Sequence, residues 1–203
     1  MLITRIVDNT LVSIALSVKH TQFFFYGHAL FSLVYTMTTA HDQYITPFGL
    51  EHDRFCMQQA LLQAQQAFAQ GEVPIGAVVI DHHGTIIAQD HNRVETQCTQ
   101  TAHAESLAIR SAGEVIGDWR LTNCWLYVTL EPCSMCFALL QLSRCAGVLY
   151  ATHSPLFGYR LDNTHESQVY KKDALIQAEG LLGDESRTLL KQFFQQKRIK
   201  SEQ

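Results

Sequence analysis

Two short stretches of the sequence carry residue types that hold metal ions and move protons. They are His103-Ala104-Glu105 and Pro132-Cys133-Ser134-Met135-Cys136. A Cys-x-x-Cys pair at the start of a helix brings both sulfurs near one point, and the free N–H groups of the helix N-terminus favour the thiolate form. Two thiolates and one imidazole suit zinc. The sequence therefore predicts a zinc site built from His103, Cys133 and Cys136.

The number and charge of these ligands predict how such a site would work. Three protein ligands leave the fourth tetrahedral position to water, as in catalytic zinc sites. Two thiolates neutralise the formal charge of Zn²⁺, so the metal acidifies its water less than it would with three neutral histidines. A base is then needed beside the metal. Glu105, two residues after the histidine, is predicted to take a proton from that water and return it to a departing amine.

The two stretches gain specificity from occurring together. A lone Cys-x-x-Cys is weak evidence, because it could equally be redox-active or structural. A structural zinc knot would need a fourth protein ligand and would give Glu105 no role. His-x-Glu followed by Pro-Cys-x-x-Cys is the known signature of the zinc deaminases that act on nucleobases. We therefore expect hydrolysis of an exocyclic amine.

The composition of the chain limits the class of protein. With 203 residues, 47% of them hydrophobic, the chain can bury one sizeable core, so we expect one domain and an appendage. A formal net charge of -4 argues against non-specific binding of nucleic acid over the whole surface, so such a partner must be held locally. The six cysteines accompany an ordinary globular composition, which favours a reduced, cytoplasmic compartment. Four of them are expected to be small buried hydrophobic residues, namely Cys56, Cys98, Cys124 and Cys145.

The first 36 residues differ from the rest of the chain. Their two apolar runs, Leu11 to Leu16 and Phe23 to Tyr35, both fall short of the roughly 20 residues of a membrane span. The stretch also lacks the features of a signal or transit peptide. We expect residues 1–36 to be a non-native or disordered extension upstream of a physiological start at Met37. Residues 37–50 are then a linker and residues 51–203 the zinc-dependent deaminase domain, with no membrane partner.

Periodicity and turn residues predict alternating helices and strands. An amphipathic helix is expected from about Asp53, as its N-cap, to Gly71, followed by a hairpin of strands 75–80 and 85–89. Further helices are expected over 102–111 and 133–142, and further strands over 125–130, 146–151 and 173–179. A closing helix over 184–200 would turn Leu189, Leu190, Phe193 and Phe194 inward. Because a hairpin opens the order and helical crossovers follow, we predict an α/β layered fold with a mixed sheet.

From about Phe55 to Lys200 the chain resembles the bacterial tRNA-specific adenosine deaminases, the TadA family of the cytidine deaminase-like superfamily. The matching stretches are Val73 to Val78, Asn92-Arg93, Thr101 to Glu105, Tyr127 to Cys133 with Met135-Cys136, and Leu189-Leu190 with Phe193-Phe194. The resemblance implies a three-layer αβα sandwich around a mixed, about five-stranded sheet. It also implies a homodimer with one zinc ion per subunit, which converts adenosine to inosine at the wobble position of a tRNA anticodon stem-loop.

The resemblance also suggests which residues contact the substrate. Asn92 would hydrogen-bond the purine, although an Asx-turn after the second strand is a plain alternative. Pro74 and Leu130 would wall the base, and Ser154 and Phe194 are further candidates. The closing helix ends in the most basic stretch of the chain, formed by Lys191, Lys197, Arg198 and Lys200. These charges could contact phosphates or simply form a solvated face.

The sequence departs from the family pattern in two places around the expected site. His153-Ser154 stand where the family carries an Arg-Asp pair, and Leu156-Phe157-Gly158-Tyr159 replace a Gly- and Ala-rich turn. Thr99-Gln100 replace an Asp-Pro pair before the histidine. These differences lie outside the catalytic set, so the reaction class is unaffected, and a zinc-dependent deaminase of free guanine- or cytosine-type compounds stays an alternative. A non-catalytic scaffold that keeps zinc for folding is a third reading, and the intact Glu105 argues against it.

Overall fold

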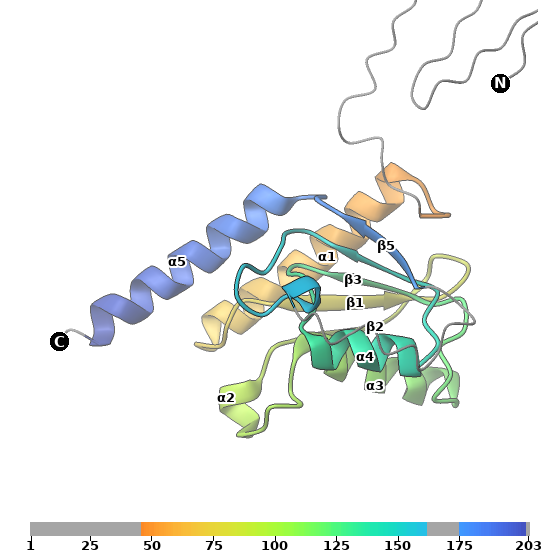
Figure 1. The fold of residues 1–203 in the computed structure, drawn as a ribbon, viewed down its shortest axis with the longest axis horizontal. Helices are drawn as coiled ribbons and strands as arrows, with labels where there is room; N and C mark the ends of the chain where they lie inside the picture. The colour runs from red at the N-terminus through yellow and green to blue at the C-terminus, as the bar shows by residue number, and fades with distance from the viewer. Residues whose placement is uncertain (1–45, 162–174, 202–203) are drawn as a thin grey trace, which may run out of the picture. The chain divides into compact units, whose positions relative to one another are not determined.

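The computed structural model describes residues 46–161 and 175–201. The expectations for residues 1–36, and for residues 37–45 of the predicted linker, lie outside these described residues. The described part is built on a five-stranded sheet with strand order β2-β1-β3-β4-β5 (Figure 1). This confirms the predicted mixed, five-stranded α/β fold.

The strands follow the predicted order and are shorter than predicted at most ends. They are β1 (Gly76–Ile80), β2 (Ile86–His91), β3 (Trp125–Val128), β4 (Gly147–Tyr150) and β5 (Ile176–Glu179). β1 pairs antiparallel with both β2 and β3. β3, β4 and β5 pair parallel with one another. β2, β3 and β4 therefore end at the same edge of the sheet.

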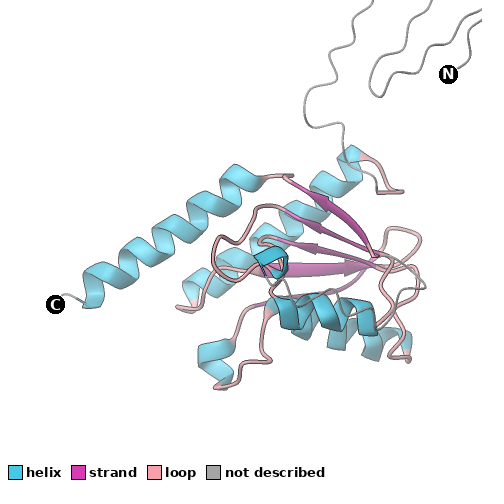
Figure 2. Ribbon diagram, viewed as in Figure 1, coloured by secondary structure: helices cyan, strands magenta, loops and turns pink. Residues whose placement is uncertain are grey.

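Helices cover both faces of the sheet, as Figure 2 shows. They are α1 (Leu50–Ala69), α2 (Val94–Gln97), α3 (Ala104–Ile116), α4 (Ser134–Leu142) and α5 (Gly183–Ser201), with a 3₁₀ turn at Tyr159–Leu161. α1 packs on one face, whereas α3 and α4 pack on the other, giving the three layers that were predicted. None of the helices in the described ranges is long and apolar enough to cross a membrane.

Alternation along the strands builds the two cores. In β1 and β3, residues 77, 79, 126 and 128 join the cluster under α3 and α4, whereas residues 78, 80, 125 and 127 join the cluster under α1. Successive side chains of a strand point to opposite faces, so a strand covered on both sides must be apolar throughout. This explains the unbroken apolar runs of β1, β3 and β4.

Several local expectations are corrected by the structure. α1 begins at Leu50, so Asp53 is not its cap; the Asp53 carboxylate is buried and accepts hydrogen bonds from Tyr127 Oη (2.6 Å) and Thr46 Oγ1. Phe194 is 46% exposed, whereas Phe193 beside it is buried. Cys98 is exposed, while the three other isolated cysteines are buried as expected. The short helix α2 and the 3₁₀ turn were not predicted, because neither is long enough to show a period.

Gly76, at the start of β1, allows the sheet to approach α1 closely. A Cβ atom there would lie 2.1 Å from the Ala60 carbonyl oxygen and 2.4 Å from the Ala64 amide nitrogen, both of them backbone atoms. Because backbone cannot yield as a side-chain end can, Gly76→Ala should lower the free energy of unfolding by about 3 kcal/mol or more. Urea denaturation would measure this. Gly113→Ala, whose added methyl meets its nearest atom at 3.3 Å, is the control, and an equal loss in both variants would contradict the packing account.

Candidate active site

The predicted metal ligands meet at the edge of the sheet where β2, β3 and β4 end. His103 is the N-cap residue of α3 and Cys133 is the N-cap residue of α4, and both have extended backbones. The His103 Nδ1 atom lies 3.6 Å from Cys133 Sγ and 3.5 Å from Cys136 Sγ. The three ligand atoms all lie within 4.8 Å of one another. The fold thus brings His103 together with two cysteines that lie 30 and 33 positions further along the chain.

The chemistry of this donor set fits a divalent cation. Hydrogen bonds from Cys136 and His103 lower the pKa of the Cys133 thiol to about 4, against the effect of burial. The contact with Cys133 and burial both raise the pKa of Cys136. A cation beside the two sulfurs would favour the thiolate form of both cysteines. One imidazole and two thiolates make that cation zinc by ligand preference.

Glu105 lies in the first turn of α3 and is buried, with 3% of its surface exposed. Its Oε2 atom makes no hydrogen bond with any part of the chain that the structure describes. Burial raises the pKa of this carboxyl above its ordinary value, while the charge of His103 acts in the opposite direction. An unsatisfied carboxylate oxygen is costly in a protein interior, so it is retained where chemistry requires it. This oxygen is suited to hold and release a proton beside the metal cluster.

Asn92 follows β2 and is 4% exposed. Its backbone N–H donates to the Ile75 carbonyl (3.0 Å), and the next N–H along the chain donates to the Ala102 carbonyl (2.9 Å). These bonds hold Asn92 close to the segments that carry Pro74 and His103. The Asn92 side chain donates to a residue 20 positions away and makes no Asx-turn within the described residues, so that alternative is wrong.

The partner of Asn92 is Glu72, a residue that the sequence interpretation missed. The Glu72 carboxylate is fully buried and accepts from Asn92 Nδ2 (3.2 Å), the Glu95 N–H (3.2 Å) and the Thr96 N–H (2.7 Å). Burial alone would raise the pKa of Glu72, but the hydrogen bonds from Thr96 and Glu95 and the charge of Lys197 outweigh it and lower the pKa. Glu72 is therefore an ionised carboxylate, and it holds the first turn of α2. The feature of the sequence that could have indicated Glu72 is a single acidic residue just before an apolar strand.

Leu130 is brought to the same edge by the residue before it. The Thr129 N–H donates to the Gly76 carbonyl (3.1 Å), and Thr129 Oγ1 accepts from the Gly76 N–H (3.2 Å). Leu130 is half-buried, and it follows the residue that pairs with Gly76, two positions after the buried Pro74. On the other side, Ser186 Oγ donates to the Thr129 carbonyl (2.6 Å), which anchors the start of α5 at the site.

Ser154 lies in the loop that departs from the family pattern. Its N–H donates to Glu131 Oε2 (3.0 Å), and its hydroxyl accepts from the Phe157 N–H (3.2 Å). The loop returns to the metal motif, because Gly158 forms an isolated β-bridge with Cys133. Ser154 itself is buried, so its contact with substrate stays a prediction.

Phe194 stands apart from this cluster on α5. The centroid of its ring lies 5.3 Å from that of Phe193. The Phe193 ring in turn packs against Phe68 of α1, with the two centroids 5.8 Å apart. The Phe194 ring is exposed, and its contact with the substrate stays a prediction. Lys197 stacks over the Phe193 ring, which places positive charge on the same helix.

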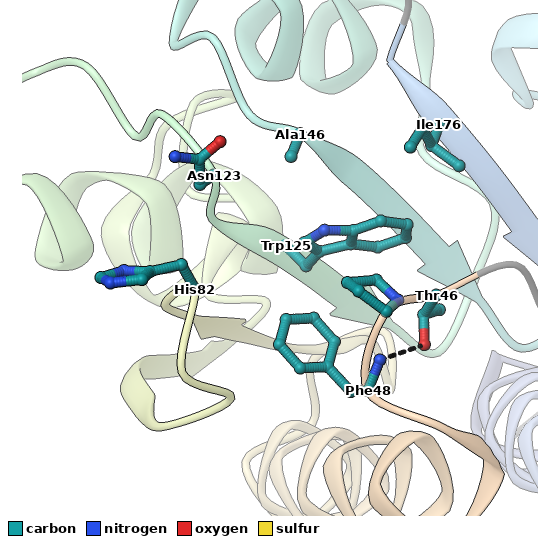
Figure 3. A pocket seen from close by; sticks show the side chains of 8 residues that line it. Thr46, Phe48, His82, Asn123, Trp125, Ala146 and Ile176 are labelled. Carbon is teal, nitrogen blue, oxygen red and sulfur yellow. Dashed lines mark hydrogen bonds between the residues drawn. The ribbon is translucent and has the colours of Figure 1, made fainter.

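A separate cavity of about 440 Å³ opens near the opposite ends of β3 and β4 (Figure 3). Its lining includes the apolar side chains of Trp125, Phe48 and Ile176, together with His82 and Asn123. Trp125 begins β3, whereas the metal motif follows the end of β3. The cavity contains none of the predicted site residues and is not part of the metal site.

Comparison with known proteins is consistent with this geometry. Residues 50–152 match the family model of the cytidine and deoxycytidylate deaminase zinc-binding region. A curated relative from Bacillus subtilis (strain 168), the tRNA-specific adenosine deaminase, is 39% identical over 74% of this chain and 94% of its own length. The metal cluster and Glu105 all fall within the matched region.

Two solved structures share the fold. One comes from a study of A-to-I editing by tRNA:A34 deaminases at the wobble position of transfer RNA. It is 38% identical, with a TM-score of 0.62, and covers 67% of this chain and 99% of that chain. The second, a guanine deaminase from Nitrosomonas europaea, is 22% identical with a TM-score of 0.58, covering 74% of this chain and 93% of that chain. At that identity the second supports the fold alone.

Proposed function

The chain belongs to the family of the bacterial tRNA-specific adenosine deaminases, within the zinc-binding cytidine and deoxycytidylate deaminases, and we propose that it converts adenosine to inosine at the wobble position of a tRNA anticodon. The observation that carries this proposal is the cluster of His103, Cys133 and Cys136 together with the buried carboxylate of Glu105, whose Oε2 atom makes no hydrogen bond with the described residues. Relatives at this identity and coverage supply the substrate class. The reaction is a hydrolytic deamination.

His103, Cys133 and Cys136 are the residues that would hold the zinc ion of this family. Zinc bound there supplies Lewis-acid polarisation of a water molecule. Glu105 takes a proton from the attacking water and delivers it to N1 of the purine as the new C6–O bond forms. It then passes the second proton of that water to the amine as the C6–N bond breaks. Adenosine and water thus give inosine and ammonia with no other reactant.

The remaining site residues would bind the base. Pro74 and Leu130 supply apolar surface at the edge of the sheet, and the Asn92 amide supplies one donor and one acceptor for a purine edge. An adenosine in an anticodon loop is already unpaired, so moving it into a pocket costs less than extruding a base from a duplex. In the cluster at the start of α3 and α4, His103 and Cys133 are partly exposed, whereas Cys136 is buried.

We further propose that the active form is a cytoplasmic homodimer with residues 51–203 as the catalytic domain. The family suggests dimerisation, and light scattering of the purified chain tests it directly. Residues 1–36 are proposed to be dispensable for catalysis, and deletion to a start at Met37 tests this. Unchanged turnover by the shorter chain supports the proposal, whereas loss of turnover opposes it.

The substrate assignment makes a direct prediction. With zinc present, the full chain should form inosine in an anticodon stem-loop that bears adenosine at the wobble position. The value of kcat/KM for this substrate should exceed that for free adenosine by at least about 10²-fold, because contacts outside the reacting base bind the transition state. Free cytidine and free guanine complete the panel. Turnover of one of these free compounds, with none in the stem-loop, would contradict the proposal.

A further inference from the structure

Glu72 determines which way the Asn92 side chain faces. An ionised carboxylate can only accept hydrogen bonds, whereas an amide carries a donor at one end and an acceptor at the other. The Asn92 side chain must therefore turn Nδ2 toward Glu72 Oε2, at 3.2 Å. A flipped amide would place two oxygen acceptors against each other. The chemistry of the pair thus fixes the order of donor and acceptor that Asn92 presents.

The Glu72 carboxylate is itself held in place. It is fully buried, and backbone N–H groups of Glu95 and Thr96 hold its two oxygens at 3.2 and 2.7 Å. Backbone donors at the first turn of α2 cannot rotate away as side-chain donors can. No described residue other than Glu72 makes a side-chain hydrogen bond with Asn92, so its carbonyl oxygen and second N–H remain for a ligand.

We propose that Glu72 is a positioning residue that sets the base specificity of the site by locking the orientation of the Asn92 amide. This inference rests on the proposed function, because it requires Asn92 to contact the purine. A locked amide matches one order of donors and acceptors on a base edge, and a base with the reverse order leaves buried polar groups unpaired. Glu72 touches neither the substrate nor the metal ligands, and acts through Asn92.

The test is a double-mutant cycle that measures kcat and KM on the wobble-adenosine stem-loop. Glu72→Gln retains shape but lets the amide of Asn92 flip, so KM should rise about tenfold while kcat stays within about twofold. In the Asn92→Ala background, Glu72→Gln should have no further effect on KM beyond about twofold. Equal effects in both backgrounds would mean that Glu72 supports α2 in a general way, which would overturn the proposal.

A second pair of variants keeps the test valid if Glu72→Gln proves unstable. Asn92→Asp places two carboxylates against each other, and it should raise KM more than Glu72→Gln does. Adding Glu72→Gln to Asn92→Asp restores a donor opposite an acceptor, so the combined variant should recover part of the loss. A combined variant that is worse than Asn92→Asp alone opposes the proposal.

Asp53→Asn is the matched control, because Asp53 is also a fully buried carboxylate with three hydrogen-bond contacts to its partners. It should lower the unfolding temperature and leave KM unchanged. Activity of the wild-type chain distinguishes failure of the proposed function from failure of the proposed role of Glu72. If the wild type fails on the stem-loop, the proposed function is wrong. If the wild type succeeds and the cycle is additive, the role of Glu72 alone is wrong.

Discussion

Glu105→Ala is expected to keep its zinc and to lose turnover by at least about 10³-fold. General acid–base catalysis alone contributes 10²- to 10⁴-fold in enzymes, and here one carboxylate serves both the incoming water and the departing amine. With two thiolates at the metal, little activation of water remains once this base is removed. Stopped assays of inosine formation give the turnover, and metal analysis of the same preparation gives the zinc content.

Glu105→Gln is the conservative partner of this experiment. It retains the shape and the polar end of the side chain but cannot accept a proton at neutral pH, so its loss should be close to that of the alanine variant. Both variants should fold as stably as the wild type or more so, because the unsatisfied Oε2 atom of Glu105 is costly in the interior. Turnover within tenfold of wild type in either variant would contradict the role of Glu105.

Cys133→Ala is expected to lose the metal itself. Its sulfur is one of three ligand atoms, and its low thiol pKa makes it the more readily ionised member of the cysteine pair. Zinc content should fall below about a tenth of one equivalent after dialysis, and turnover should disappear with it. The unfolding temperature should also fall, because a metal that binds only the folded cluster stabilises the fold, and this stabilisation is lost with the ligand.

Cys98→Ala provides the matched control for Cys133→Ala. Cys98 is exposed and lies outside the metal cluster, so its replacement should keep zinc and turnover near wild type. Atomic absorption on both variants separates loss of a ligand from loss of a thiol. A Cys133→Ala variant with a full equivalent of zinc would show that the cluster has been assigned wrongly.

The sequence predicted the metal cluster well because its signal is local. His103 and Cys133 each stand at the start of a helix, and both helix starts follow from the short motifs themselves. The positions of the central strands along the chain followed from short apolar runs, which a sheet covered on both faces requires. Each motif and each apolar run depends on residues within a few positions of one another, whereas the meeting of His103 with the two cysteines depends on the fold.

The features that sequence reasoning missed depend on distant pairs. Glu72 is 20 positions from Asn92, and Asp53 is 74 positions from Tyr127, so neither partner could be read from spacing. Each is a buried carboxylate that only tertiary structure satisfies. Asp53 was interpreted as a helix cap because an acidic residue near a helix start usually is one. Burial reversed that expectation, since the Tyr127 hydroxyl reaches Asp53 across the core.

The conformation of the loop after β4 could not be predicted from the sequence either. Its sequence departs from the family pattern, and its conformation depends on Glu131, whose carboxylate accepts from the N–H groups of Ser154 and Arg160. Glu131 lies inside the recognised motif, yet no spacing rule predicts which loop it would hold. The site is therefore predictable in its chemistry and less so in the walls around it.

Hydrolytic deamination of the wobble adenosine is tested by following a stem-loop in water enriched with heavy oxygen. We expect inosine at that position, one heavy oxygen at C6 of each inosine, and one ammonia released per inosine formed. A stem-loop with adenosine placed elsewhere in the loop should remain unchanged. Absence of inosine at the wobble position in the zinc-loaded enzyme, or inosine without heavy oxygen, would contradict hydrolytic deamination of tRNA adenosine by this protein.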